Sequence, residues 1–109
     1  MMSEYSKYWD ETVKPAAIEL IKIATTDKAA TEYYVGGMIW AVEHDLADGR
    51  ELGLNAGGAL LQVRGVFSDD SYFEHIHSET PSSEIDKMRN LAKLISELFE
   101  KVEHDDGEV

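Results

Sequence analysis

The sequence predicts an all-α fold, a small bundle of about four helices with a kink near Pro15. Two observations support this fold class. Apolar residues recur every three or four positions in four separate segments, and a chain of 109 residues has room for one domain only. We therefore expect a single helical domain over residues 1–103, followed by an acidic tail, residues 104–109, that frays.

The first segment covers about residues 3–25, and Pro15 interrupts it. A proline removes a backbone hydrogen-bond donor and disfavours helical geometry at the preceding residue, here Lys14. This predicts a kink, or two shorter helices that meet at this point. A helix that begins near Lys14 instead places Pro15 in its first turn, where proline is tolerated. The apolar positions of the segment are Tyr5, Trp9, Val13, Leu20, Ile21 and Ala24.

The second segment begins at Asp27, a suitable helix N-cap, and ends at the turn signal Asp48-Gly49. Gly36 and Gly37 in its middle each cost a helix about 1 kcal/mol relative to alanine. This cost indicates either the close approach of another helix or a strand over residues 33–42. As a helix, the segment has an apolar face made of Ala30, Tyr33, Tyr34, Gly37, Met38, Ala41, Val42 and Leu46.

The third segment runs from Asn55 to about Phe67 and fits two structures as well. Asn55 can cap a helix, whereas the glycines at positions 57, 58 and 65 weaken that prediction. The alternative to the helical bundle is therefore an α+β fold in which the glycine-rich middle, with residues 33–42 and 57–67 as strands, forms a short hairpin.

The fourth segment is the clearest helix. Thr80 is expected to cap it and Pro81 to occupy its first helical position. Its apolar stripe is consistent with two roles. It is either a seam between two copies of the chain, which predicts a homodimer, or the inward face of an intramolecular bundle. The residues predicted to mediate self-association are Ile85, Met88, Ile95, Phe99 and Val102.

The charge balance is the most distinctive global feature. Ten Lys and Arg face 22 Asp and Glu, which gives a net charge of −12. Such a field repels nucleic-acid phosphates and anionic membranes and attracts basic protein surfaces. We therefore expect neither direct nucleic-acid binding nor membrane binding. The alternative is that the acidity serves solubility alone.

The sequence also excludes several kinds of chemistry. The chain has no cysteine, so disulfides, zinc–thiolate sites and cysteine nucleophiles cannot form. Its first residues lack the cationic and apolar pattern of a signal peptide, and no apolar stretch is long enough to span a bilayer. Together with the missing cysteines, this predicts a cytoplasmic protein. Phosphate-loop, dinucleotide-binding and GxSxG serine patterns are absent.

Two short clusters carry residue types used in catalysis. His75 and His77, with Glu74 and Glu79 nearby, are metal-ligand types, but two histidines at this spacing diverge on a helix. The sequence Glu43-His44-Asp45 can supply an acid–base pair, or simply form the polar last turn of a helix. We expect no metal, no cofactor and no catalysis. A metal-dependent enzyme that uses His75 and His77 is the lower-ranked alternative.

The function expected from these features is that of a non-enzymatic acidic protein-binding module. In general character it resembles small helical immunity proteins and phage-encoded inhibitors of host defence, a likeness of type in which no residue corresponds. Such an inhibitor occupies the basic, nucleic-acid-binding surface of a partner, for example a nuclease or a nucleic-acid-binding effector. The alternative is a homo-oligomeric structural or adaptor subunit. The predicted partner-binding residues are Asp45, Asp48, Glu51, Asp69, Asp70, Tyr72, Phe73, Glu74 and Glu79.

Overall fold

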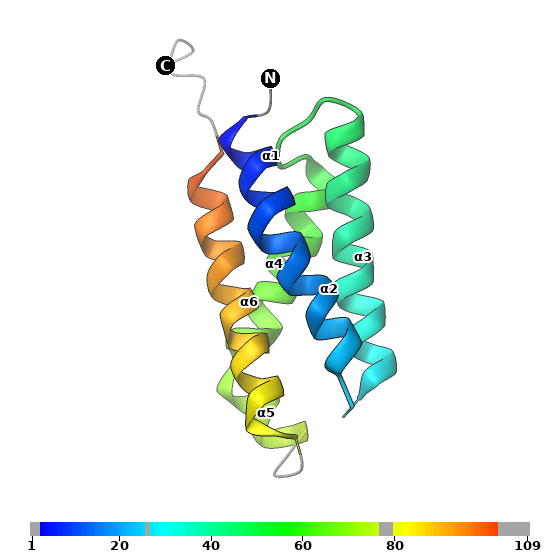
Figure 1. Ribbon diagram of the computed structural model, residues 1–109, viewed down its shortest axis with the longest axis vertical. Helices are drawn as coiled ribbons and strands as arrows, with labels where there is room; N and C mark the ends of the chain where they lie inside the picture. The colour runs from blue at the N-terminus through cyan, green and yellow to red at the C-terminus, as the bar shows by residue number, and fades with distance from the viewer. Residues whose placement is uncertain (1–2, 26, 77–79, 103–109) are drawn as a thin grey trace.

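The computed structural model describes residues 3–25, 27–76 and 80–102, without the side chains of Phe73, His75 and Ile76. These residues form an up-down-up-down helical bundle (Figure 1). The all-α prediction is confirmed: the part of the chain that is described contains no strand, and residues 33–42 and 57–67 are helical. In chain order the elements are α1 (Glu4–Tyr8), the π-helical segment η1 (Trp9–Val13), α2 (Lys14–Ile23), α3 (Lys28–Ala47), α4 (Leu54–Ser68), the short α5 (Asp70–Ile76) and α6 (Ser82–Glu100).

The four long helical stretches pack as a ring around one core. α3 lies between α2 and α4, α4 lies between α3 and α6, and α6 closes the ring against α1, η1 and α2. The start of α1 and the end of α6 lie at the same end of the bundle, and α5 lies at the other end (Figure 1). The fully buried large side chains are Trp9, Tyr5, Leu20, Met38, Leu60, Met88, Leu91, Ile95, Leu98, Val13, Val35 and Val42.

The interruption expected at Pro15 takes the form of a π-helical segment. The backbone N–H of Lys14 donates to the carbonyl of Trp9, five residues earlier, instead of the carbonyl four residues earlier. The chain therefore stays helical from Glu4 to Ile23, and Pro15 lies in the first turn of α2, where its missing N–H is tolerated.

The helix starts differ in detail from those predicted. Asp27 occupies the N-cap position of α3, but its backbone is left-handed, with φ 52°, and its side chain makes no capping hydrogen bond. Asn55 lies inside α4, whose cap position is taken by Gly53. Thr80 precedes the cap position of α6, which is Pro81, so that prediction was wrong by one residue.

The buried face of α3 is rotated away from the predicted one. Tyr33, Tyr34 and Gly37 were expected inside, yet all three are exposed, and the core instead receives Thr31, Val35 and Asp45. Aromatic character alone does not bury a side chain, because much of a folded protein's surface is apolar. The outer side of α3 is therefore unusually rich in apolar groups.

The apolar stripe of α6 is used within the chain. Met88 and Ile95 are fully buried, and Ile85, Phe99 and Val102 pack half-buried against the same core. Met88 and Ile95 are therefore occupied by their own bundle and do not form a dimer seam, whereas the self-association of Ile85, Phe99 and Val102 stays a prediction. In the described residues, no helix combines the length and the apolar character needed to cross a membrane.

Candidate functional site

The acidic residues predicted to bind a partner do not form one surface. Asp48 and Glu51 precede α4, whereas Asp69, Asp70 and Glu74 follow it. The 15 residues of α4 span about 22 Å, so the two groups lie at opposite ends of the bundle (Figure 1). Proximity in sequence suggested a continuous acidic patch, and the straight helix between the two groups separates them.

Asp45 is buried and caps a helix instead of facing solvent. Its side chain is 1% exposed, and Oδ2 accepts a hydrogen bond of 2.9 Å from the backbone N–H of Ala56 in the first turn of α4. Gly53, at the cap position, has no side chain that could do this. Asp45 on α3 therefore replaces the missing N-cap of α4. Its prediction as a partner-binding residue was wrong.

The hydroxyl of Tyr5 lies close to the same cluster. Burial, followed by the charges of Asp45 and Glu51, raises the pKa of Tyr5 to about 12, although the Leu52 backbone partly offsets this effect. Tyr5 is fully buried on α1. The Tyr5 hydroxyl of α1 thus lies near the buried carboxylate that joins α3 to the start of α4.

Two predicted carboxylates at the other end have structural partners. Asp69 Oδ1 accepts hydrogen bonds from the N–H and the hydroxyl of Ser71, at 2.9 and 2.8 Å, and these bonds lower the pKa of Asp69. Asp69 therefore caps the start of the short helix α5. Asp70 Oδ1 accepts a hydrogen bond of 2.7 Å from Arg89 on α6. Both carboxylates remain exposed.

The predicted aromatic anchor Tyr72 is half-buried. Its ring lies against Phe67, with centroids 6.2 Å apart, and burial raises its pKa. The remaining members of the two predicted sites lie outside the described residues, namely the side chains of Phe73 and His75, and residues His77 and Glu79.

The sequence Glu43-His44-Asp45 does not assemble an acid–base pair. Glu43 accepts a hydrogen bond of 3.1 Å from Trp9 Nε1 and pairs with Lys14 at 2.8 Å, and Lys14 lowers the pKa of Glu43. His44 instead stacks on Trp40, with centroids 4.8 Å apart. The third residue, Asp45, is buried and caps α4, as described above. Among the residues that the structure describes, no group of three His, Asp or Glu side chains could hold a metal ion.

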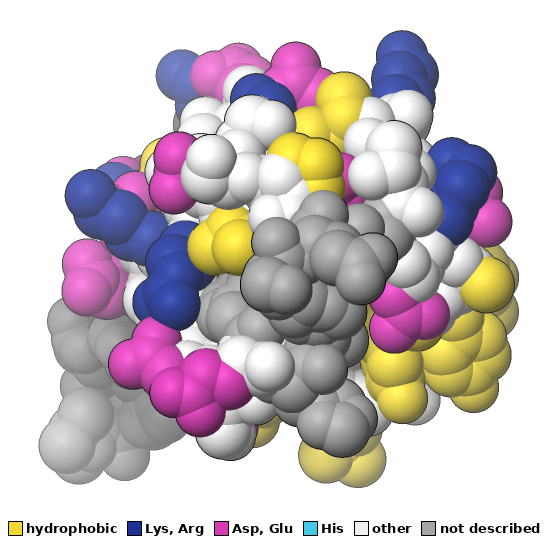
Figure 2. Space-filling model, turned by 90° about the horizontal axis from the view of Figure 1, so that it is seen from below, with side chains coloured by type: hydrophobic (Ala, Val, Ile, Leu, Met, Phe, Trp, Pro, Cys, Tyr) yellow, Lys and Arg dark blue, Asp and Glu magenta, His cyan; other side chains and the backbone are white. Residues whose placement is uncertain are grey.

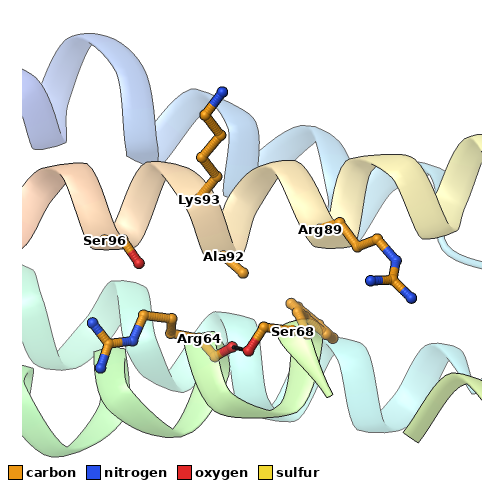
Figure 3. A pocket seen from close by; sticks show the side chains of 7 residues that line it. Arg64, Ser68, Arg89, Ala92, Lys93 and Ser96 are labelled. Carbon is orange, nitrogen blue, oxygen red and sulfur yellow. Dashed lines mark hydrogen bonds between the residues drawn. The ribbon is translucent and has the colours of Figure 1, made fainter. Parts of the chain in front are cut away.

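A shallow groove of about 360 Å³ separates α4 from α6 (Figure 3). Its cations do not converge. Arg64 and Arg89 point toward opposite ends of the groove and Lys93 points away from α4 (Figure 3). Arg64 lies over the Phe99 ring, 5.0 Å from its centroid, and Arg89 binds Asp70. In this arrangement the groove presents no common point at which an anion is held. Its lining residues are Arg64, Phe67, Ser68, Arg89, Ala92, Lys93 and Ser96.

The outer side of α3 and α4 carries the largest exposed apolar side chains. Trp40 is 63% exposed and Leu54 is 95% exposed. Figure 2 shows the largest group of hydrophobic side chains at its lower right edge, on the side that α3 occupies in Figure 1. We call this surface the α3/α4 face. It comprises the exposed residues Tyr33, Tyr34, Gly37, Trp40, Leu54, Gly58, Leu61 and Gly65.

The residues of this face recur at helical spacing on each helix. Positions 33, 37 and 40 form one stripe, and positions 54, 58, 61 and 65 form the other. Residues 33–42 contain no Lys, Arg, Asp or Glu, and the only charged residue of α4 is Arg64. These uncharged runs are visible in the sequence and could have indicated the face. Tyr33 and Tyr34 were assigned to the inward face of their helix instead.

Comparison with known proteins gives no guide to this surface. No family model, curated protein or solved structure matches the chain. Its function is therefore argued from the geometry and chemistry of its own residues.

Proposed function

We propose that this protein is a non-enzymatic, cytoplasmic interaction module that binds a protein partner through the α3/α4 face. The observation that carries the proposal is the exposure of large apolar side chains on two adjacent helices. Exposed apolar surfaces are typical of interaction sites. Aromatic residues, tryptophan and tyrosine above all, contribute disproportionately to the binding energy of protein interfaces.

The magnitude supports a specific role for Trp40. A tryptophan side chain covers up to about 250 Å², of which 63% is exposed here. At about 25 cal/mol per Å², covering the exposed part contributes up to about 4 kcal/mol. That value is in the range of an interface hot spot. Leu54 and Leu61 add smaller amounts from the neighbouring helix.

A second candidate function rests on the net charge of −12. The module would occupy the basic, nucleic-acid-binding surface of a nuclease or another effector. Exposed carboxylates such as Asp69 and Glu74 raise the association rate with such a partner, whereas buried apolar contacts govern dissociation. In this version the charged ends of the bundle steer the encounter and the α3/α4 face holds the complex.

Photo-crosslinking in living cells tests the main proposal. A photoreactive phenylalanine analogue replaces Trp40 or Leu61 on the α3/α4 face, and Ile18 in a control variant. Ile18 is an exposed apolar residue on α2, outside the face. We expect discrete protein adducts from positions 40 and 61 and none from position 18. No adduct from the face, or equal adducts from all three positions, refutes the proposal.

The second candidate function has its own test. The pair Asp69→Asn and Asp70→Asn keeps the capping oxygen of Asp69, since asparagine caps helices as well. If the carboxylates steer a basic partner, this pair and added salt both lower the association rate. An association rate that responds to neither change eliminates the steering role.

A further inference from the structure

We propose that the partner of the α3/α4 face is a second copy of this chain, in a two-fold symmetric dimer. This inference rests on the proposed function, because it names the occupant of the same face. Three properties of the face favour a copy of the chain over another protein. They are its charge, its shape and its area.

Charge restricts how two copies can meet. Each copy carries a net charge of −12, so most of its surface repels another copy. The α3/α4 face is different, because residues 33–42 have no Lys, Arg, Asp or Glu and Arg64 is the only charged residue of α4. Two copies can join there without apposing carboxylates. A basic partner, in contrast, finds no carboxylate within residues 33–42 or within α4.

The shape of the face is suited to pairing with itself. A two-fold interface uses one patch on both subunits, so the patch must offer both projections and hollows. Trp40, Leu54 and Leu61 project from it. At Gly37 and Gly58 a Cβ atom would meet nothing within 4 Å, so a projecting side chain can approach the helix backbone there.

The glycines of the face lower the stability of their helices, and nothing within a single copy of the chain explains their presence. An exposed glycine inside a helix is about 1 kcal/mol less favourable than alanine. Open space surrounds the Cβ position at the three glycines of the face, so the bundle itself has room for side chains there. Together they cost about 3 kcal/mol, a large part of the stability of a small domain. Close approach of a second copy provides a reason to leave these positions bare. They are Gly37, Gly58 and Gly65.

The available area suits a dimer of modest affinity. The 20 residues of α3 extend about 30 Å, and two helices side by side are about 20 Å wide. The footprint is therefore about 600 Å² per copy, somewhat below the roughly 800 Å² per partner of a standard interface. We expect dissociation in the micromolar range, about 1 to 100 µM.

Sedimentation equilibrium of the full chain between about 1 and 500 µM tests the proposal. The chain has a mass of 12.2 kDa, so the dimer has about 24 kDa. We expect Trp40→Glu to raise the dissociation constant about 100-fold. Gly37→Leu should also weaken the dimer, although leucine favours the helix. Ile18→Glu, the control outside the face, should leave the dissociation constant unchanged. Far-UV circular dichroism of each variant verifies that it is folded.

Each outcome decides between the two proposals. A wild-type chain that stays monomeric throughout the concentration range overturns the dimer. So does a dimer that Trp40→Glu and Gly37→Leu leave intact, because it must use another surface. If the chain is monomeric but position 40 crosslinks to a protein of different mass, only the second copy is wrong and the interaction module stands. If there is neither a dimer nor a crosslink from the face, both proposals fail.

Discussion

The contact between Gly53 and Asp45 allows a sharp test of the capping arrangement. An alanine at position 53 places its Cβ 2.8 Å from Asp45 Cγ and closer still to Oδ2. The backbone of Gly53, with φ −67° and ψ 175°, suits alanine equally well. Any loss of stability in Gly53→Ala, beyond the small preference of a cap position for glycine over alanine, therefore arises from the buried carboxylate of Asp45. That carboxylate cannot move without losing its hydrogen bond to Ala56.

The magnitudes can be worked out for both partners. Forcing a methyl group against a fixed side chain typically costs 1–3 kcal/mol, so we expect about 2 kcal/mol for Gly53→Ala. Asp45→Ala loses a hydrogen bond to a charged group and leaves the Ala56 N–H without its acceptor, which costs about 2 kcal/mol. In the double variant the carboxylate is gone and the methyl group has room. Its destabilisation should fall short of the sum of the two single effects by more than about 1 kcal/mol.

Urea denaturation followed by circular dichroism measures these free energies of unfolding, and each 2 kcal/mol corresponds to about 8 °C in Tm for a chain of this size. Gly58→Ala is the matched control in the same helix, because its new Cβ meets nothing within 4 Å. It should raise stability by about 1 kcal/mol at a protein concentration low enough to keep the chain monomeric. Additive effects of Gly53→Ala and Asp45→Ala would refute the reasoning.

Three further predictions concern the core and its polar groups. Because the pKa of Tyr5 is raised from 10.0 to about 12, the unfolded chain loses this proton first. The contribution of the protonated Tyr5 to the free energy of unfolding is therefore complete below pH 10 and is lost between pH 10 and 12. The loss is roughly 2–3 kcal/mol, and Tyr5→Phe should remove this share of the alkaline loss in urea titrations. Thr25→Val deletes the hydroxyl that donates to buried Glu84 at 2.6 Å, so it should cost about 1–2 kcal/mol. The same substitution at Thr12, on η1, should cost less; equal losses would mean that the hydroxyl bond to Glu84 is not the cause. Ile95→Ala, at a fully buried position, should cost 2–5 kcal/mol by urea denaturation, and a loss below 1 kcal/mol would place Ile95 outside the core.

The helices could be predicted from the sequence where spacing and composition agree. In α6 the apolar residues keep helical spacing over the whole segment and no glycine interrupts them, so the pattern has one solution. In α3 and α4 the glycines and β-branched residues oppose the helix. There the segments are helical because tertiary packing of their inner faces outweighs local preference. Periodicity alone could not show this.

The candidate site was harder to predict than the fold. Asp45 looks like a solvent-facing carboxylate because its partner, the N–H of Ala56, lies eleven residues away in another helix. Tyr33 and Tyr34 look like core residues because they are aromatic, yet both are exposed on α3. Both errors have one physical origin. The sequence gives the period of a helix accurately, whereas the neighbouring helices set its rotation about its own axis.

The double use of Asp45 bears on where this chain tolerates foreign sequence. Its backbone carbonyl accepts the N–H of Arg50 at 2.8 Å, while its side chain accepts that of Ala56. One residue thus fixes both sides of the connection between α3 and α4, which also requires the positive φ of 79° at Gly49. A peptide tag or a chain break inserted there would separate these contacts. The start of α1 and the end of α6, which emerge side by side at one end of the bundle (Figure 1), are the places to attach a label or to join the ends in a circular permutant.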